Sequence, residues 1–240
     1  MRAMILAAGR GERMRPLTDH LPKPLIPVAG KPLIQWHLEK LARAGICDVV
    51  INHAWLGELL EQALGDGHAL GLRLRYSAEA TALETAGGIA TALPLLGEEP
   101  FLVLNGDIWC DWDPTQAHAV AQQLVTQQDL AWLLMVPNPA QHPAGDFFLA
   151  HNGRVHDEAS RAPHAPRHTF SGIGVYQPKL FAQTPAHQPA KLAPLLREAM
   201  ADERVVGRLH PTEWIDVGTP ERLAALEGKI AKMHKKNNAV

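Results

Sequence analysis

The sequence lacks the features that mark disulfide-rich, membrane-spanning and secreted proteins. Its 240 residues include only two cysteines, Cys47 and Cys110, which are far apart and form no CxxC pair. Both are therefore expected to be reduced, buried groups rather than parts of a disulfide framework. No apolar run approaches the roughly 20 residues of a transmembrane helix, and the apolar stretch at 3–8 is too short for a signal peptide. We expect a cytoplasmic protein that does not bind membranes.

The sequence also lacks an excess of either charge. Lysine and arginine total 23, against 25 aspartates and glutamates, which gives a formal net charge of -2. A coat of nucleic acid requires a basic surface, so this balance argues against nucleic acid as a partner. Small anions that are bound locally are the expected partners. A chain of this length can bury about 70–75% of its unfolded surface and needs no disulfide or metal to fold.

Short apolar runs alternate with segments of helical periodicity through the first half of the chain. This alternation predicts a Rossmann-like α/β fold, in which a mostly parallel sheet is flanked by helices on both faces. Strands are expected at 4–6, 49–51, 72–76, 101–104 and 131–136. Helices are expected around 34–41, with a stop at Gly45, and at 56–64, 85–96 and 114–127.

From Pro137 onward the apolar pieces are shorter and are separated by proline, histidine and glycine. Strands are expected at 147–150, 155–156, 172–176 and 205–210, and helices at about 192–201 and from Pro220 to about Met233. The tail at 235–238 is expected to fray. No internal repeat, low-complexity tract or linker interrupts the chain, so residues 1–240 are expected to form a single domain.

The most informative segment is residues 5–32, ILAAGRGERMRPLTDHLPKPLIPVAGKP, where an apolar strand enters a glycine-rich and strongly cationic turn. Gly9 and Gly11 have no Cβ, so the backbone there can adopt left-handed angles and point its N–H groups at an anion. Arg13, Arg15 and Lys23 add positive charge. We therefore expect this turn to bind a polyphosphate, with a solvated surface turn as the alternative.

Two common phosphate-binding motifs do not fit this segment. The third glycine of a dinucleotide-binding fingerprint would fall at Met14. A Walker loop could close only at Gly30-Lys31, where Pro32 stands in place of the serine or threonine that binds magnesium. The turn therefore belongs to neither class.

The segment resembles the signature of the sugar-1-phosphate nucleotidyltransferases, which is a strand followed by Ala-x-Gly-x-Gly-x-Arg-x-x-Pro-Leu-Thr and then by Pro-Lys-Pro. Residues 7–18 and 22–24 match this pattern. Glu12 departs from it, because the family more often has threonine there. Gly-Glu-Arg at 11–13 is similar to the branch of short enzymes that resemble N-acetylmuramic acid 1-phosphate uridylyltransferases.

The resemblance implies a nucleotide-binding half at about 1–136 and a sugar-phosphate-binding half at about 137–234. The base is expected against the end of the first strand and against 83–88, which resembles the family's Gly-Thr-Ala-Gly element with Glu84 in place of the first glycine. The residues expected to contact the nucleotide are Ala8, Gly9, Gly11, Glu12, Arg13, Lys23, Leu83 and Gly88.

Two aspartates are the expected ligands of a magnesium ion. Asp107 follows a fully apolar strand, where a carboxylate is costly to bury unless it binds a cation or a partner. Asp216 lies in WIDVGTPE at 214–221, which resembles the family's terminal Trp-x-Asp-x-Gly-Thr-Pro-Glu element. In the family these two aspartates hold Mg²⁺. Taken alone, Asp107 could be an Asx-turn residue and Asp216 a helix cap.

Ligands of open parallel sheets bind beyond the carboxyl ends of the strands. This rule places the 9–23 loop, the pair 52–53 and the triplet 105–107 on one rim. On the acceptor side the resemblance implies four substrate contacts. Two of them, Asp146 and Glu158, could equally be exposed charges, and the Lys-Pro that follows the glutamate in the family is missing. The four residues are Asn105, Asp146, Glu158 and Thr169.

Two further features are less specific. Asp111 and Asp113 could extend the metal site, but Asp113-Pro114 is more typical of a helix cap. Four of the 13 histidines cluster at 151–168, yet their spacing matches no zinc pattern and no thiol is near. We expect a polar loop there rather than a zinc site.

The resemblance also implies a mechanism. A sugar 1-phosphate is already anionic near neutral pH, so its oxygen can attack the α-phosphorus of a nucleoside triphosphate without a general base. Lys23 is expected to bridge the two phosphates and Arg13 to bind the departing pyrophosphate, so that positioning and charge lower the barrier.

Three hypotheses about function follow. The first is a uridylyltransferase that converts UTP and N-acetylmuramic acid 1-phosphate to UDP-N-acetylmuramic acid and pyrophosphate in cell-wall sugar recycling. The second is a guanylyl- or thymidylyltransferase that acts on mannose, glucose or heptose 1-phosphate. The third is a non-catalytic regulator that binds nucleotide sugars, which would need a damaged phosphate or metal site. The sequence gives no indication of the oligomeric state.

Overall fold

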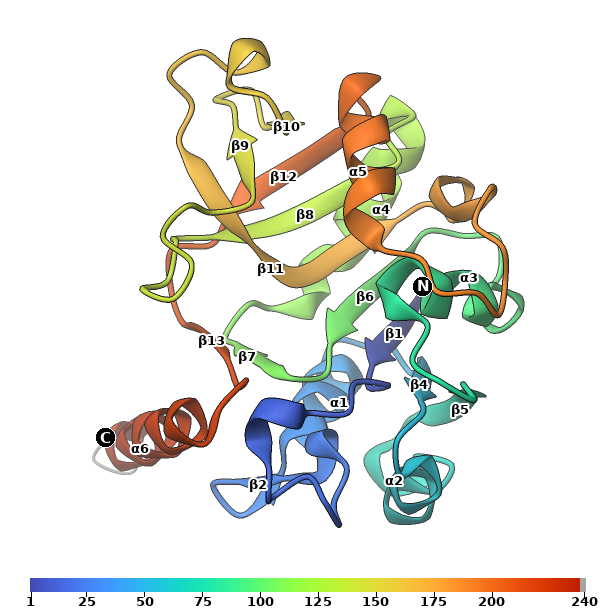
Figure 1. Ribbon diagram of the computed structural model, residues 1–240, viewed down its shortest axis with the longest axis vertical. Helices are drawn as coiled ribbons and strands as arrows, with labels where there is room; N and C mark the ends of the chain where they lie inside the picture. Colours follow the sequence, from blue (N-terminus) through green and yellow to red (C-terminus); the bar gives the residue numbers. More distant parts are fainter. Residues whose placement is uncertain (238–240) are drawn as a thin grey trace.

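One central β-sheet carries both halves of the chain (Figure 1). The structure is a computed structural model that describes residues 1–237, with side chains as far as Met233. The strands of this sheet are β1 (Arg2–Leu6), β4 (Asp48–His53), β5 (Arg73–Ala78), β6 (Phe101–Asn105), β8 (Ala131–Val136), β9 (Phe147–Leu149), β10 (Val155–His156), β11 (Arg167–Tyr176) and β12 (Val205–Leu209). They follow the order β10-β9-β11-β6-β1-β4-β5, and β8 pairs with both β11 and β12.

β1 lies at the centre of the parallel part of the sheet. It pairs in parallel with β4 on one side and with β6 on the other, and β5 extends the sheet in parallel beyond β4. β11 runs antiparallel to β6 and β8, and β8 pairs in parallel with β12. The α/β fold with a mostly parallel central sheet is therefore confirmed.

Helices cover both faces of the sheet. Successive residues of a strand point to opposite sides, so a strand that is apolar throughout needs cover on both faces. The helices packed on it are α1 (Leu33–Arg43), α2 (Gly57–Leu64), α3 (Glu84–Leu96), α4 (Ala117–Gln127) and α5 (Leu192–Ala201). In β1, Ala3 and Ile5 face a cluster with α1, α2 and α4, whereas Met4 faces a cluster with α3 and α5. The alternation along β1 thus gives each face its own apolar core.

Two short ribbons beside the main sheet were not expected from the sequence. β2 (Pro27–Val28) pairs with β3 (Lys31–Pro32), and β7 (Ile108–Cys110) pairs with β13 (Trp214–Asp216). The last helix, α6 (Pro220–Asn237), packs Leu226 and Ile230 against Val28 and Val217 in a small separate cluster. These contacts bring the C-terminal segment back to residues that follow β1 and β6.

Most of the expected elements are present, with small shifts at their ends. β11 begins at Arg167, five residues before the expected start at 172. The helix expected over 114–127 begins as a 3₁₀ turn that Asp113 caps by accepting the N–H of Thr115, as expected. α6 continues past its expected end, and Asn238 of the tail expected to fray lies outside the described residues. The 3₁₀ turns are η1 (Glu12–Met14), η2 (Lys23–Leu25), η3 (His68–Leu70), η4 (Pro114–Gln116), η5 (Ala159–Arg161) and η6 (Pro178–Phe181).

Candidate active site

A first cavity of about 370 Å³ lies at the carboxyl ends of β1, β4 and β6, where open parallel sheets bind their ligands. The glycine-rich turn, the end of β6 and the start of α3 all contribute to it, so the predicted rim is present. Its lining residues are Leu6, Ala7, Ala8, Gly9, Lys23, Pro24, Asn52, Ala82, Glu84, Thr85, Asn105, Gly106 and Asp107.

The two glycines of the turn differ in conformation. Gly11 has a φ of +70°, and a Cβ there would lie 2.9 Å from Thr18 Cγ2 and 3.3 Å from Lys23 Cβ. Its carbonyl oxygen accepts the hydroxyl of Thr18 and the N–H of Met14. Gly9 is not left-handed, and nothing lies within 4 Å of the position that its Cβ would take. The left-handed conformation expected at both glycines is therefore found only at Gly11, while Gly9 leaves open space beside the cavity.

Lys23 and Asp107 form an ion pair at the first cavity. Lys23 Nζ donates to Asp107 Oδ2 at 2.6 Å. Lys23 is only 7% exposed, and a buried ammonium group needs such a partner, whereas 41% of the Asp107 side chain remains accessible. The pair ties the turn after β1 to the end of β6 and leaves a carboxylate accessible to a ligand.

The ribbon of β7 and β13 brings the second aspartate to the same place. Asp216 pairs with Ile108 in this ribbon, and the N–H of Val217 donates to the carbonyl oxygen of Asp107 at 2.8 Å. Asp216 forms an ion pair with Arg222 on the first turn of α6. A Cβ on Gly218 would lie 2.9 Å from both Asp216 Oδ1 and Arg13 Nη2. The cationic turn and the two aspartates, distant in sequence, therefore converge.

A buried polar network fixes the wall of the first cavity. The amide of Asn52 accepts the N–H of Ala7 at 3.0 Å and donates to Glu79 at 2.7 Å, and Glu79 also accepts the N–H of Leu83 at 2.9 Å. A Cβ on Gly88 would lie 2.8 Å from both Asn52 and Glu79. Leu83 and Gly88 do not line the cavity, but they contact the residues that shape it. Glu79 was not singled out from the sequence. An acidic residue directly after β5 was the signal that could have indicated it.

Glu84 adopts a conformation that glycine would adopt at no cost. Its φ is +58°, and its position is the one at which the family element has glycine. A left-handed residue with a side chain is strained by about 1–2 kcal/mol, and such strain gathers at functional sites. Glu84 lines the first cavity at the N-terminus of α3, where an acidic side chain also interacts favourably with the helix dipole.

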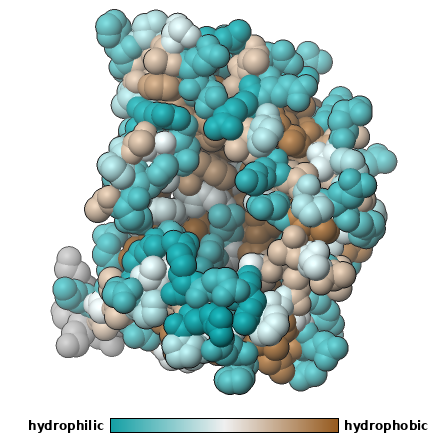
Figure 2. Space-filling view, viewed as in Figure 1, coloured by the Kyte–Doolittle hydropathy of each residue, from teal (hydrophilic) through white to brown (hydrophobic). Residues whose placement is uncertain are grey.

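A second cavity of about 280 Å³ adjoins the first and shares four of its lining residues. Figure 2 shows this face of the molecule hollowed near its middle, where β11 passes in Figure 1, with white and brown residues between hydrophilic margins. Asp146 lines the cavity, and its carboxylate accepts the N–H of Phe170 at 2.8 Å and contacts His142 at 3.1 Å. The lining residues are Leu6, Glu84, Thr85, Val103, Asn105, Asp146, Phe147, Phe170, Gly172, Tyr176, Lys191, Leu192, Ala193 and Leu196.

Besides Gly11, Leu83 and Gly88, four more of the expected contact residues lie outside the linings of both cavities. Glu12 is exposed and forms loose ion pairs with neighbouring arginines, and Arg13 is exposed beside Gly218. Glu158 is exposed and accepts the Ser160 hydroxyl. Thr169 is buried and donates to Asn138 Oδ1 at 2.9 Å. Their expected contacts with substrate stay predictions.

His37 of α1 supports the strand that follows Asp107. It is buried, and its Nε2 donates to the carbonyl oxygen of Ile108 at 2.8 Å. Burial lowers the pKa of His37 to about 4, so the imidazole is neutral near neutral pH and can hold this bond without adding a charge. The sequence reasoning placed no functional weight on His37.

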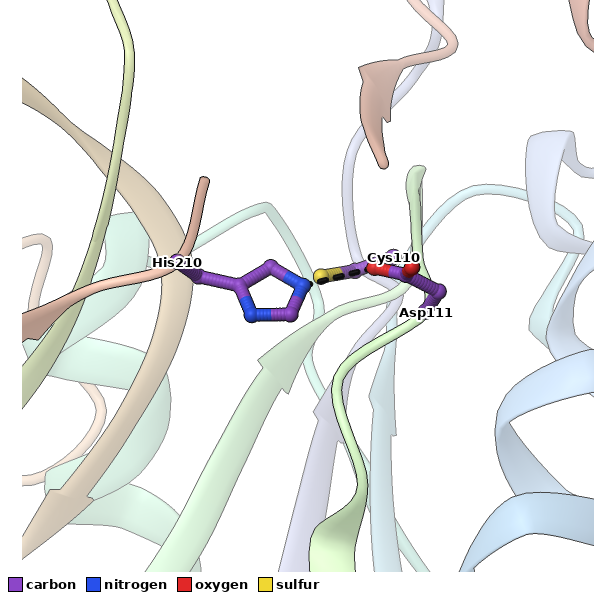
Figure 3. A group of neighbouring side chains, drawn as sticks. All are labelled: Cys110, Asp111 and His210. Carbon is purple, nitrogen blue, oxygen red and sulfur yellow. Dashed lines mark hydrogen bonds and ion pairs between the residues drawn. The ribbon is translucent and has the colours of Figure 1, made fainter. Parts of the chain in front are cut away.

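A separate cluster of Cys110, Asp111 and His210 (Figure 3) lies at the opposite end of β7 from Asp107 and Asp216. Their ligand atoms lie within 4.8 Å of one another, which is close enough to hold a metal ion. However, Asp111 Oδ1 already accepts His210 at 2.6 Å, the Thr212 hydroxyl at 2.8 Å and the N–H of Glu213 at 3.1 Å. Burial raises the pKa of Cys110 to about 11, so the thiol stays protonated near neutral pH. We interpret the cluster as a set of structural hydrogen bonds that hold the end of β7 to the segment before β13.

Comparison with known proteins places the chain in a family. In the described part of the chain, no helix is both long enough and apolar enough to cross a membrane. The family model for nucleotidyl transferases matches residues 2–233. The chain therefore belongs to the nucleotidyl transferase family, and the resemblance inferred from the glycine-rich turn is confirmed.

Individual relatives narrow this class. The chain is 54% identical over 224 residues to the N-acetylmuramate alpha-1-phosphate uridylyltransferase of Neisseria meningitidis, a match that covers 93% of this chain and 95% of the relative. It is 36% identical to the protein of the same name from Caulobacter vibrioides, covering 96% of this chain and 97% of the relative. A solved structure of UDP-glucose pyrophosphorylase with UDP-glucose has a TM-score of 0.75 at 19% identity, covering 97% of this chain and 98% of that one, which shows a shared fold.

Proposed function

We propose that the protein transfers a uridylyl group from UTP to N-acetylmuramic acid 1-phosphate, and so acts in cell-wall sugar recycling. The products are UDP-N-acetylmuramic acid and pyrophosphate. The two relatives named N-acetylmuramate alpha-1-phosphate uridylyltransferase match almost the full length of the chain. The observation that carries the proposal is the pairing of the buried Lys23 with Asp107 beside two adjoining cavities. This arrangement supports two anionic substrates that meet at one charged centre.

The two cavities suggest how the substrates divide between the halves of the chain. We assign the first cavity, built within about 1–136, to the nucleotide, and the second, which draws on about 137–234, to the sugar phosphate. The sugar phosphate would meet Asn105 and Asp146 in the second cavity, with Glu158 and Thr169 beyond its lining. The nucleotide would lie against Ala8, Gly9, Gly11, Glu12, Arg13, Lys23, Leu83 and Gly88.

The chemistry needs no general base. An oxygen of the sugar phosphate forms a bond to the α-phosphorus of UTP, and the bond from that phosphorus to the bridging oxygen breaks, so that pyrophosphate leaves with the electron pair. Lys23 holds the donor and acceptor phosphates together against their mutual repulsion. Arg13 lies beside Gly218 and Asp216, where its positive charge can stabilise the negative charge that grows on pyrophosphate.

The donor set at this centre fits magnesium. Asp107 and Asp216 lie on paired or directly adjoining backbone, and both side chains are partly accessible. Magnesium prefers hard oxygen ligands and is usually held by one or two carboxylates together with substrate phosphates. When bound there, Mg²⁺ would supply charge screening between the two phosphate groups. The Cys110 cluster carries a thiol and an imidazole, which suit softer metals, so we assign no magnesium to it.

Pyrophosphate release tests this proposal. The protein is assayed with each of the four nucleoside triphosphates UTP, GTP, TTP and ATP against the 1-phosphates of N-acetylmuramic acid, N-acetylglucosamine, mannose, glucose and heptose. We expect the highest kcat/KM for UTP with N-acetylmuramic acid 1-phosphate. A preference for GTP or TTP with mannose, glucose or heptose 1-phosphate would contradict the proposal and support a guanylyl- or thymidylyltransferase instead. Binding without turnover in every combination would indicate a regulator instead.

A further inference from the structure

The second cavity contains one cation that the reaction described above does not use. Three charged residues line this cavity: Glu84, Asp146 and Lys191. The carboxylate of Asp146 is occupied by Phe170 and His142. By contrast, within the described part of the chain, no acidic group forms an ion pair with Lys191. Lys191 is exposed at the edge of the cavity, where an ammonium group without an ion-pair partner, next to charges that are otherwise acidic, is suited to an anionic ligand.

The backbone that carries Lys191 is held firmly against the start of α3. The N–H of Ala190 donates to the carbonyl oxygen of Leu83 at 3.0 Å. The carbonyl oxygen of Ala190 in turn accepts the N–H groups of Ala86 and Gly87 at 2.9 and 3.1 Å. A Cβ on Gly87 would lie 2.2 Å from the carbonyl oxygen of Gln188, so this close approach requires glycine. Lys191 therefore starts from a fixed point at the edge of the cavity.

The remaining walls of the cavity would strengthen the action of such a charge. They are largely apolar, with aromatic rings from β9 and β11 and leucines from α5. Charges attract more strongly where water is displaced by apolar groups. The same walls also suit the ring and the acetyl methyl group of an N-acetylated sugar.

We propose that Lys191 binds the lactyl carboxylate of the N-acetylmuramic acid group and thereby selects this acceptor. This inference rests on the proposed function. N-Acetylmuramic acid 1-phosphate differs from N-acetylglucosamine 1-phosphate only in the lactyl ether, which adds one carboxylate. Without Lys191 that carboxylate would meet the acidic side chains of Glu84 and Asp146 alone. Lys191 is thus a specificity-determining residue, and Lys23 remains the group that holds the reacting phosphates.

The test compares the two acceptors with saturating UTP in the unchanged protein, in Lys191→Met and in Lys191→Arg. We expect Lys191→Met to lower kcat/KM for N-acetylmuramic acid 1-phosphate by about 10–100-fold, mainly through KM, since a hydrogen bond between charged groups is lost. For N-acetylglucosamine 1-phosphate the change in kcat/KM should stay within about twofold. This acceptor has no lactyl carboxylate, so it makes no hydrogen bond to Lys191 that the substitution could remove. Lys191→Arg keeps the charge and should restore most of the lost activity.

A matched control is Lys179→Met. Lys179 lies in η6, is exposed and does not line the second cavity, so its loss should alter neither acceptor's kinetics. Thermal unfolding of each variant checks that the fold is retained. Where turnover of N-acetylglucosamine 1-phosphate is slow, its inhibition constant against the muramic acid substrate replaces kcat/KM.

Each other outcome overturns the inference in a distinct way. Equal losses for both acceptors would show that Lys191 binds the 1-phosphate, which both share. No loss for either acceptor would show that the side chain does not reach the substrate. If the unchanged protein releases no pyrophosphate from UTP with N-acetylmuramic acid 1-phosphate, the proposed function itself fails, and this inference fails with it.

Discussion

The two cavities adjoin each other but are built in different ways. In the first, polar side chains are already bonded to one another, as Lys23 is to Asp107 and Asn52 is to Glu79. In the second, the walls are largely apolar, and Lys191 has no ion-pair partner among the residues that the structure describes. Under the proposed function, the first cavity would fix the geometry of the reacting phosphates, whereas the second would decide which acceptor is bound.

The origin of this difference lies in the sheet. The first cavity sits at the ends of parallel strands that are buried on both faces, so backbone geometry places its groups. The second lies between antiparallel strands and α5, and its character depends on single side chains. Variants of the first cavity should therefore affect all acceptors alike, and variants of the second should affect one acceptor more than another.

The largest effect is expected from the charged pair of the first cavity. Lys23→Met and Asp107→Asn each remove one charge, and we expect each to lower kcat by on the order of 10²–10³-fold, as does the loss of one preorganised charge donor in other enzymes. Because the reacting phosphates are common to all acceptors, the loss should be equal for each acceptor that is turned over. Pyrophosphate release with two different sugar phosphates measures it.

Asp202→Asn is a suitable control for these variants. Asp202 is exposed at the C-terminal end of α5 and lines neither cavity. Near wild-type turnover in Lys23→Met or Asp107→Asn would contradict the role given to the pair. A loss confined to one acceptor would break the comparison between the two cavities.

A smaller effect is expected on stability, through the residue that supports β7. The folded-state pKa of His37 is about 4 as the net result of four effects. Burial lowers the pKa most, the hydrogen bond to Ile108 raises it, Lys40 lowers it, and the charge of Asp107 raises it. The unfolded chain, with a pKa near 6.5, therefore takes up a proton that the folded protein refuses between these values. Stability is lost as the pH falls from about 6.5 toward 4, by roughly 2–3 kcal/mol.

The measurement is urea unfolding of the wild-type protein and of His37→Gln at about pH 7 and about pH 4.5. Glutamine does not titrate and can donate to the same carbonyl oxygen, so its stability should fall less over this range. If both proteins lose stability equally on acidification, His37 is not the buried neutral group described here.

Much of the first cavity followed from the sequence because its signals are local. The apolar strands that end at Leu6 and Asn105 are continuous in the chain, and the glycines and cations of the turn are adjacent to one of them. A strand end predicts a ligand site without knowledge of any side-chain contact. The fold class and the rim of the first cavity could be predicted for this reason, whereas the convergence of Asp107 with Asp216 was implied only by the resemblance to the family.

Other features could not be predicted, because they depend on contacts between distant segments. The ribbon that joins Asp107 to Asp216 has strands of three residues, too short to leave a periodic pattern. Glu79 and Lys191 gain their roles only where β5 and the segment before α5 meet the start of α3. No spacing rule links these positions, and only the folded chain shows that they surround one site.

The smallest effect is expected at Glu84, which lines both cavities and so belongs to neither side of the comparison. Glu84→Ala and Glu84→Gly both remove the carboxylate, but only glycine adopts the observed φ of +58° without strain. We therefore expect Glu84→Gly to be more stable than Glu84→Ala by about 1 kcal/mol in urea unfolding. Equal stability of the two variants would contradict the left-handed conformation. Any change in acceptor preference that the two variants share would then report the carboxylate alone, and would show whether the border between the cavities contributes to selection.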